Sequence, residues 1–504
     1  VTENWFDLNA SRYTPSSTLQ RMELLKTGYM GTLSLGWDNY LFLELTGRQE
    51  RSSTLKDQSF FYPSTNLSFL FTQAFHMPSW WNYGKLRLSY GIVGNAPETY
   101  TANIVYEQGS DNGFTWNTIP SSWGNADIRP EKKYEYEIGL ESKFLNNRLG
   151  IDISYYNNRV KDQILSTPQP STSGVKNVLM NVGEVANHGW DISISATPIL
   201  TRDFRWDLTA NYGVYKNKVV KLADGVPYLE ILNSGGSGIK IQAVEGQPMG
   251  DIYALVPQVN ENGEYLVSDK GLYLNQTELQ KVGNINPAGV GGLFNSFSYK
   301  NVFLDFSIDF RIGGDVINEM NQYATAVGLT PESLKYRDTE HGGLSYYYPG
   351  DNNSSGIPVQ VDPSTGAGPN GEIIYHDGII LPGVVASTGE RNTRIIPAGY
   401  YYNTTYNWGT EAEQLTYRHS VFDNSYVKLR ELTIGYQFPE KMISKLGLGR
   451  LSVSVFGRNL FYFYKALKNY DAESSVGTSW ANQATVGSST TATRSFGVSL
   501  RASF

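Results

Sequence analysis

The chain has 504 residues, enough for one very large unit or for roughly two to four ordinary domains. Its net charge of −7 argues against nucleic acid as a partner, because phosphate binding needs a basic face. The absence of cysteine excludes a disulfide scaffold and thiolate chemistry. No apolar run approaches the length of a transmembrane helix. Aromatic residues reach 13% and charged residues only 18%, which suits a membrane–water boundary, a sugar- or peptide-binding surface, or a large β-sandwich.

From residue 26 onward, apolar side chains recur at every second position, which predicts strands. The first two strands meet at a tight turn, Asp38-Asn39. Two-faced segments follow at 85–92, 134–144, 148–156, 190–198, 204–214, 301–312, 431–439, 450–456 and 495–504. Because successive strand side chains point to opposite faces, each segment has one apolar and one polar surface.

The lengths of the connections alternate between short and long. Short turns are expected near 38–39, 145–148, 200–203, 300–301 and 439–449. Long connections are expected at 47–59, 94–132, 157–188, 216–290, 313–424 and 464–492. This alternation is typical of an outer-membrane barrel with short periplasmic turns and long extracellular loops. Connections of a β-sandwich should scatter in length, and a propeller should repeat about every 40–50 residues.

The sequence therefore predicts an all-β protein, a transmembrane antiparallel up-and-down β-barrel. It contains about 13 strands, or 14 if NWFDLNASRY forms one. The last strand then runs toward the periplasm, with Phe504 as a C-terminal signal for barrel assembly and the C-terminus in the periplasm.

Several blocks of sequence occur in an order that resembles the SusC/RagA family of TonB-dependent outer-membrane transporters. The blocks are YLFLELTGRQERSSTL, SFFYPSTNLSFLFTQAF, KLRLSYGIVGN, YEYEIGLESKFLNNRLGIDISYYNNRVKDQIL, NVGEVANHGWDISISATPI, FDNSYVKLRELTIGYQFP and VSVFGRNLFYFYK. The resemblance covers nearly the whole chain. It implies a barrel of about 22 strands, of which residues 1–504 form the C-terminal part, while the N-terminal plug and the TonB-interacting segment are expected outside this chain.

The resemblance also implies partners and a role. Family members import oligosaccharides or oligopeptides with a SusD-like surface lipoprotein as a lid, often as a dimer of such pairs, and the TonB complex supplies the energy. We therefore expect TonB-dependent nutrient import across the bacterial outer membrane, in contact with its lipid. Two other functions stay open, a passive diffusion channel of 14 strands and a surface adhesion or assembly component.

The sequence shows no catalytic pattern. Its five histidines are scattered without a paired-ligand spacing, and Ser237 lacks the context of a nucleophile elbow. The chain is therefore expected not to be an enzyme.

Long loops concentrate aromatic residues that could stack on a sugar ring or a peptide side chain. The alternative is that these rings pack the loops on themselves or on the lid lipoprotein. The candidates for substrate or lid contact are Trp116, Trp123, Tyr346, Tyr347, Tyr348, Tyr400, Tyr401, Tyr402 and Trp408.

The segment DNNSSGIPVQVD matches part of a calcium loop, with Asp351, Asn353, Ser355 and Asp362 as candidate ligands. The final acid is Asp instead of Glu, so a solvated turn is the alternative. Ca²⁺ is the one cofactor that the sequence suggests.

Charged residues on the polar faces of the strands are expected to face the barrel lumen, where water or a plug surrounds them. They either solvate the lumen and pack against the plug or guide the substrate. This set comprises Arg87, Glu135, Glu137, Asp152, Asp305, Asp309 and Arg311, with Asp191 and Asp207 on the same faces.

Overall fold

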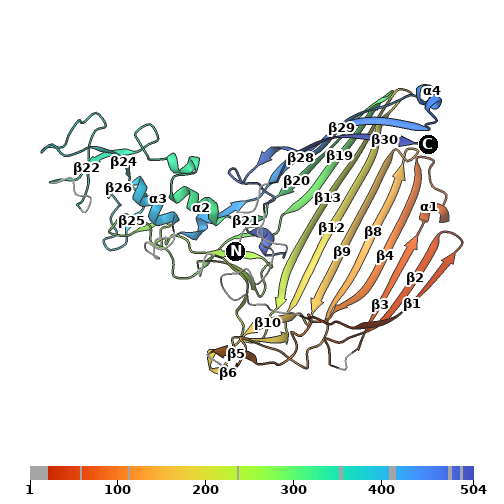
Figure 1. Ribbon diagram of the computed structural model, residues 1–504, viewed down its shortest axis with the longest axis horizontal. Helices are drawn as coiled ribbons and strands as arrows, with labels where there is room; N and C mark the ends of the chain where they lie inside the picture. The colour runs from red at the N-terminus through yellow and green to blue at the C-terminus, as the bar shows by residue number, and fades with distance from the viewer. Residues whose placement is uncertain are drawn as a thin grey trace, which may run out of the picture.

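The computed structural model describes residues 21–56, 59–111, 114–234, 238–350, 356–407, 416–474, 479–487 and 492–504. Its main feature is a curved antiparallel sheet of thirteen strands, in which strands adjacent in sequence are adjacent in space (Figure 1). In sheet order the strands are β1 (Lys26–Trp37), β2 (Leu41–Ser52), β3 (Ser59–Phe69), β4 (Trp81–Asn95), β8 (Glu131–Phe144), β9 (Leu149–Lys161), β12 (Glu184–Leu200), β13 (Phe204–Lys221), β19 (Gly289–Tyr299), β20 (Val302–Ile312), β28 (Tyr426–Gln437), β29 (Arg450–Lys465) and β30 (Ser495–Ser503).

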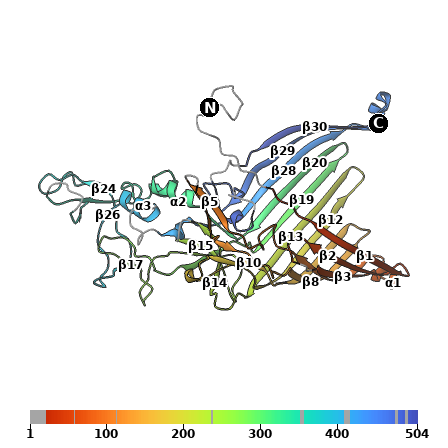
Figure 2. The same ribbon diagram turned by 60° about the horizontal axis from the view of Figure 1, so that its bottom comes forward.

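The expected fold class is confirmed by this up-and-down order. Figure 2 shows that the sheet curves from β1 to β30. The candidate fourteenth strand, NWFDLNASRY, lies outside the described residues.

The two faces of the sheet differ in a way opposite to that of a soluble protein. On β8 the apolar residues Tyr136, Ile138 and Leu140 are 45%, 47% and 40% exposed. On the opposite, concave face Glu137 is half-buried and Gly139 is buried. A soluble sheet buries its apolar face, whereas a membrane barrel turns it toward lipid and keeps the polar face inside.

Short turns close one end of the sheet. Asp38 and Asn39 have φ of 46° and 58°, and Asn146 and Asn147 have φ of 57° and 63°. Such left-handed pairs make the tight hairpin turns whose twist matches that of the strands. The turn between β3 and β4 carries α1 (Phe71–Ala74), and the turn between β28 and β29 carries α4 (Glu440–Ile443). The C-terminus lies at this end (Figure 1).

One expected loop is wrong. Residues 47–59 were predicted as a long connection, but the pairing of β1 with β2 continues from Gly31↔Gly47 to Lys26↔Ser52, and β3 begins at Ser59. The polar residues here ended the apolar alternation, yet a strand ladder is held by backbone hydrogen bonds that persist where side chains become polar. The strands therefore extend beyond their apolar parts.

The long connections gather at the other end and form structure of their own (Figure 1). The smaller strands there are β5 (Glu107–Asp111), β6 (Phe114–Thr118), β7 (Ser122–Trp123), β10 (Ile164–Pro168), β11 (Asn177–Asn181), β14 (Tyr228–Ser234), β15 (Ile239–Val244), β16 (Asp251–Ala254), β17 (Leu266–Val267), β18 (Gln280–Asn284), β21 (Asp315–Ile317), β22 (Leu344–Tyr347), β23 (Val359–Gln360), β24 (Tyr375–Ile379), β25 (Val384–Val385), β26 (Ile396–Pro397) and β27 (Val421–Asp423). The two longer helices are α2 (Glu319–Ala326) and α3 (Ala398–Tyr406).

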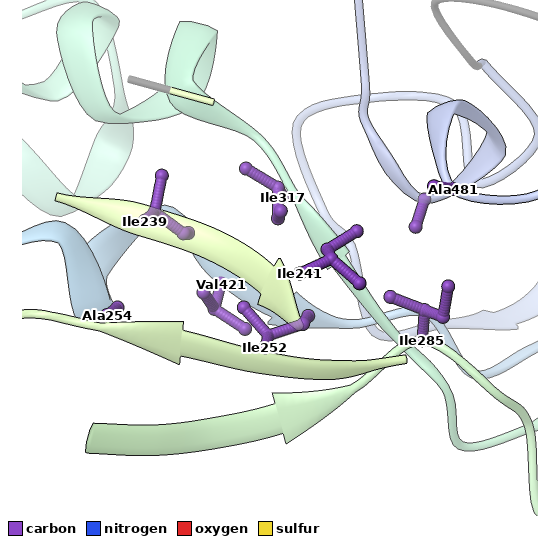
Figure 3. Packing of buried hydrophobic residues seen from close by; sticks show 9 residues of the cluster. Ile239, Ile241, Ile252, Ala254, Ile285, Ile317, Val421 and Ala481 are labelled. Carbon is purple, nitrogen blue, oxygen red and sulfur yellow. The ribbon is translucent and has the colours of Figure 1, made fainter. Parts of the chain in front are cut away.

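A compact apolar core joins three of these connections (Figure 3). Ile239 and Ile252 come from the 222–288 connection, Ile317 from 313–425, and Ala481 from 466–494; all are buried. The loops above the sheet therefore share a core and are not independent extensions.

This core allows a prediction of local stability. Ile252→Ala removes a fully buried side chain, so we expect the loop core to lose about 2–5 kcal/mol. The measurement is limited proteolysis of the folded protein, with cleavage mapped to 222–288 and 313–425. Val259→Ala removes a 47% exposed side chain from the same connection and should leave the cleavage rate unchanged. Equal rates for the two variants would show that the core does not hold these loops.

Candidate functional site

The concave face of the sheet carries a charged cavity of about 720 Å³. Its polar side chains come from successive strands because they lie in register: Asp152 pairs with Ser193, Ser193 with Asn211, and Asp309 with Gly292. The lining residues are Arg87, Asp152, Ser154, Asp191, Ile192, Ser193, Asn211, Tyr212, Gly213, Val290, Gly291, Gly292, Asp309, Phe310, Arg311 and Tyr426.

Arg87 organises one side of this cavity. Its guanidinium donates to Asp152 Oδ1 at 2.6 Å and to Ser154 Oγ at 3.2 Å, and lies 3.5 Å from Glu141 Oε2. The guanidinium crosses above Gly139, where a Cβ atom would lie 2.8 Å from Nη2. A larger residue at this position would force the Arg87 guanidinium to shift.

A second charged cluster joins strands β20 and β28 of the sheet to the 466–494 connection. Arg430 Nε donates to Asp309 Oδ2 at 2.6 Å and its Nη2 donates to Glu473 Oε1 at 2.6 Å. Lys428, only 1% exposed, donates to Glu473 Oε2 at 2.5 Å. Burial raises the pKa of Glu473, but hydrogen bonds from Arg430 and Lys428 outweigh it and lower the pKa to about 2. Glu473 therefore stays ionised across the physiological pH range.

The charged residues that were predicted to face the lumen lie at several positions on the concave face of the sheet. Arg87, Asp152, Asp309 and Arg311 line the one cavity, together with Asp191. Arg311 also donates to the backbone oxygens of Ile285 and Gly313, so it holds loop backbone as well. The remaining predicted residues are bound elsewhere on the wall: Glu135 to Lys133 and Asn158, Asp305 to Ser296, and Asp207 to Arg205 and Thr197, with Glu137 half-buried on the same face as Glu135.

The aromatic candidates of the loops divide into buried and exposed rings. Tyr346, Tyr348 and Tyr402 are 1%, 4% and 4% exposed, and Tyr346 donates to Asp377 while Tyr402 donates to the backbone oxygen of Glu332. For these three, the alternative interpretation holds, because they pack the loop on itself.

The other rings are more accessible. Trp116 is 47% exposed and Tyr400 37%. Tyr347, Tyr401 and Trp123 are half-buried, and Trp408 lies outside the described residues.

His419 stacks on Tyr406, with 4.4 Å between the ring centroids. Tyr406 in turn contacts the rings of Tyr401 and Tyr402. Burial, and to a lesser degree the neighbouring Arg418, lower the pKa of His419 to about 4. The folded loop therefore holds this histidine neutral.

The stability of the folded 313–425 connection is therefore expected to depend on pH. Between pH 6.5 and about 4 the unfolded loop binds a proton that the folded loop excludes, so the folded loop loses up to about 1.4 kcal/mol per pH unit. Protection of 313–425 from proteolysis or amide exchange should fall over this range. His419→Phe keeps a ring on Tyr406 without a titrating group and should remove the dependence; an unchanged pH profile in this variant would assign it to another group.

The calcium candidates are only partly described. Asp351, Asn353 and Ser355 lie outside the described residues, and the Asp362 carboxylate accepts from the Ser364 amide at 2.9 Å and from its hydroxyl at 2.5 Å. In the described part of the chain, no group of three or more His, Cys, Asp or Glu residues is arranged to hold a metal ion. Calcium binding stays a prediction.

The end of the chain is exposed. Phe504 follows β30 and is 98% exposed.

None of the helices in the described ranges has the length and apolar character needed to cross a membrane.

Sequence reasoning did not single out Lys428, Arg430 and Glu473. Irregular pairing of β28 with β29 near Val427 and Leu429 disturbs the alternation that identified the other wall residues. The predicted strand begins at Glu431, so Lys428 and Arg430 lie just before it in the sequence VKLREL.

Comparisons with known proteins agree with this geometry. Residues 4–252 match the family model described as TonB dependent receptor-like, beta-barrel. TonB-dependent receptor P3 of Formosa agariphila is 24% identical over 492 residues, covering 89% of this chain and 42% of the relative. SusC of Bacteroides thetaiotaomicron is 30% identical over 247 residues, covering 45% and 24%.

Among solved structures, the RagAB peptide transporter matches with a TM-score of 0.65 at 18% identity, covering 94% of this chain and 48% of that one. This likeness concerns the fold. The chain spans less than half the length of the curated relatives and of the solved transporter that it matches.

The family consists of outer-membrane receptors and transporters, which confirms the expectation that the chain is not an enzyme. Residues 4–252 therefore belong to a β-barrel of the TonB-dependent receptor type, and the chain as a whole is similar to SusC and to the RagAB transporter.

Proposed function

We propose that this chain forms the C-terminal part of the barrel of a TonB-dependent importer of nutrient oligomers. The observation that carries the proposal is the polar concave wall with its charged cavity of about 720 Å³, opposite an exposed apolar face. Such a wall suits a water-filled lumen that polar solutes and a plug occupy. The plug and the TonB-interacting segment belong to the part of the protein outside residues 1–504.

The long-connection end faces the cell exterior in this proposal, and the C-terminus faces the periplasm. Outer-membrane barrels place long loops outside and short turns inside. A SusD-like lipoprotein then covers the loop end as a lid, and two such pairs associate as a dimer. The exposed rings Trp116 and Tyr400 are available there for contact with the lid or the substrate.

The substrate is an oligosaccharide or an oligopeptide, with the oligosaccharide slightly favoured. The chain resembles SusC and the RagAB peptide transporter, among other proteins. An aromatic ring such as that of tyrosine suits either ligand, since its face is apolar and its tip can hydrogen-bond. Mass spectrometry of the molecules that copurify with the intact protein separates the two.

Uptake assays test active import. Deleting the gene for the intact protein should abolish growth on one class of oligomer, and deleting TonB should have the same effect. Uptake that continues without TonB would favour the passive channel. Growth unchanged on every oligomeric nutrient would favour a role in adhesion or assembly.

The charged wall gives the uptake assay a structural control. Arg87→Ala together with Asp152→Ala removes an ion pair from the cavity without changing the apolar face. Uptake should fall while the amount of protein in the outer membrane stays the same. Normal uptake by this variant would mean that the cavity does not lie on the substrate path.

A further inference from the structure

A group of cations lies on the outer, lipid-facing side of the sheet. Strand parity places them there: Lys132 shares the face of Tyr136 and Ile138 on β8, Arg159 and Lys161 that of Tyr155 on β9, and Lys216 and Lys218 that of Tyr212 on β13. We call these five residues, Lys132, Arg159, Lys161, Lys216 and Lys218, the basic rim. All five are exposed.

The strand register brings the basic rim together at the long-connection end of the wall. Lys132 lies opposite Lys161, Arg159 opposite Ala186, and Ala186 opposite Lys218. Glu184 lies among them, 2.9 Å from Arg159 and 4.0 Å from Lys161. Glu135 lines the adjoining pocket as well, but it pairs with Lys133. Within the described residues Lys132, Lys216 and Lys218 form no ion pair. The patch therefore keeps an excess of positive charge.

A pocket of about 220 Å³ opens within this patch. It is lined by Tyr90, Tyr134, Glu135, Tyr136, Asn157, Arg159 and Lys161. Lys161 Nζ lies 6.0 Å from the centre of the Tyr134 ring. Tyrosine rings with cations beside them suit an anionic headgroup at the membrane surface, because the rings lie at headgroup depth and the cations pair with phosphate.

Directly below, on the same strands, an apolar groove continues toward the centre of the wall. It has a volume of about 340 Å³ and is lined by Ile138, Leu140, Ile153, Tyr155 and Trp190. The Tyr155 and Trp190 rings pack at 4.9 Å between centroids. A cationic pocket above an apolar groove has the polarity of one amphiphile, with its headgroup at the rim and its acyl chain along the strands.

We propose that the basic rim and the groove below it form a binding site for a phosphate-bearing lipid of the leaflet at the long-connection end. The phosphate binds between Arg159 and Lys161, and Lys132 and Lys218 add charge around it. One acyl chain lies along Ile138 and Ile153. The site lies on the outside of the barrel wall, so it is separate from the lumen and from any substrate path.

The proposal rests on the outer-membrane location, but its test does not depend on import. The intact transporter, purified in detergent, is incubated with bisphosphorylated lipid A or with the same lipid after removal of both phosphates, and bound lipid is counted by native mass spectrometry. We expect at least tenfold more binding of the phosphorylated lipid. Raising NaCl from 50 to 500 mM should release it, because phosphate pairing at an exposed patch is screened by salt.

The double variant Arg159→Ser with Lys161→Ser should reduce binding of the phosphorylated lipid at least tenfold. The matched control is Lys133→Ser with Lys143→Ser, which removes two cations from the concave face of β8 and should bind like the wild type. Salt release in the wild type needs no variant, so the test remains valid if the double variant does not fold.

Three results would overturn the proposal. Equal binding of both lipids would mean that the apolar groove alone binds lipid and that the basic rim does not recognise phosphate. Displacement of the lipid by equimolar inorganic phosphate would make the patch a site for the free ion. Loss of transporter pairing with unchanged lipid binding in the double variant would make the basic rim a protein interface. Normal oligomer uptake alongside any of these would leave the proposed function intact.

Discussion

Ile194→Lys is expected to destabilise the folded barrel in a bilayer by about 2–4 kcal/mol. Ile194 is 39% exposed on the apolar face of β12, and it lies midway between the Tyr155–Trp190 ring pair and the turn at the end of the strand. A lysine at this depth places its charge in hydrocarbon, where the cost is greatest near the midplane. Urea titration of the intact protein folded in lipid vesicles measures the change.

The neighbouring residue provides the control. Ser193 lies on the opposite face of the same strand and lines the charged cavity together with Asp152 and Asp191. Ser193→Lys places the same charge beside two carboxylates and water, so we expect a change of less than about 1 kcal/mol. If both variants lose equal stability, or if only Ser193→Lys does, the assignment of the two faces is wrong.

The sheet could be predicted because its physics is local. Alternation of side chains such as Ile192 and Ile194 with Ser193 identifies both strand and faces without knowledge of the partner strand. Turn residues of left-handed conformation, Asp38 and Asn39, then fixed the hairpin. The strand ends were missed where residues became polar, as at the end of β2, because pairing there depends on the neighbouring backbone.

The loop end could not be predicted in the same way. The sequence left two interpretations of Tyr346 and Tyr402 open, ligand contact or packing within the loop. In the structure both rings are buried and donate hydrogen bonds to Asp377 and Glu332, which are distant in sequence. The link from Lys428 to Glu473 likewise joins a strand to a connection 45 residues away. Such contacts depend on how several loops pack together, and no periodicity in the sequence records that packing.

Removal of the Glu473 charge is expected to release the 466–494 connection from the barrel wall. Glu473→Gln leaves Lys428 buried without its carboxylate partner, and Arg430 retains Asp309 as its ionic partner together with a hydrogen bond to Asn459. Removing one partner of a buried pair is costly because the remaining charge is uncompensated. We expect the link between the connection and the sheet to lose about 2–3 kcal/mol of stability. This is less than for a fully buried pair, because the Glu473 side chain is 29% exposed.

The pH dependence follows from the same contacts. The pKa of Glu473 falls from 4.5 to about 2 in the folded protein, so its contribution is fully present above pH 4.5 and is lost as the pH falls toward about 2. Proteolysis of 466–494 with an acid protease should accelerate over this range in the wild type. In Glu473→Gln it should be fast at every pH.

Glu431→Gln is the matched control for this cluster. Glu431 is also on β28, and it pairs with Arg458 at 3.1 Å, but both side chains are well exposed, at 38% and 57%. An exposed pair contributes less than about 1 kcal/mol because water screens it, so this variant should resist proteolysis like the wild type. Equal sensitivity of the two variants would mean that the buried pair Lys428–Glu473 holds the connection no more strongly than the exposed pair Arg458–Glu431 holds its strands. Slow proteolysis of Glu473→Gln would show that the apolar contacts of Ala481 and Ala484 with the loop core hold this connection without the charges.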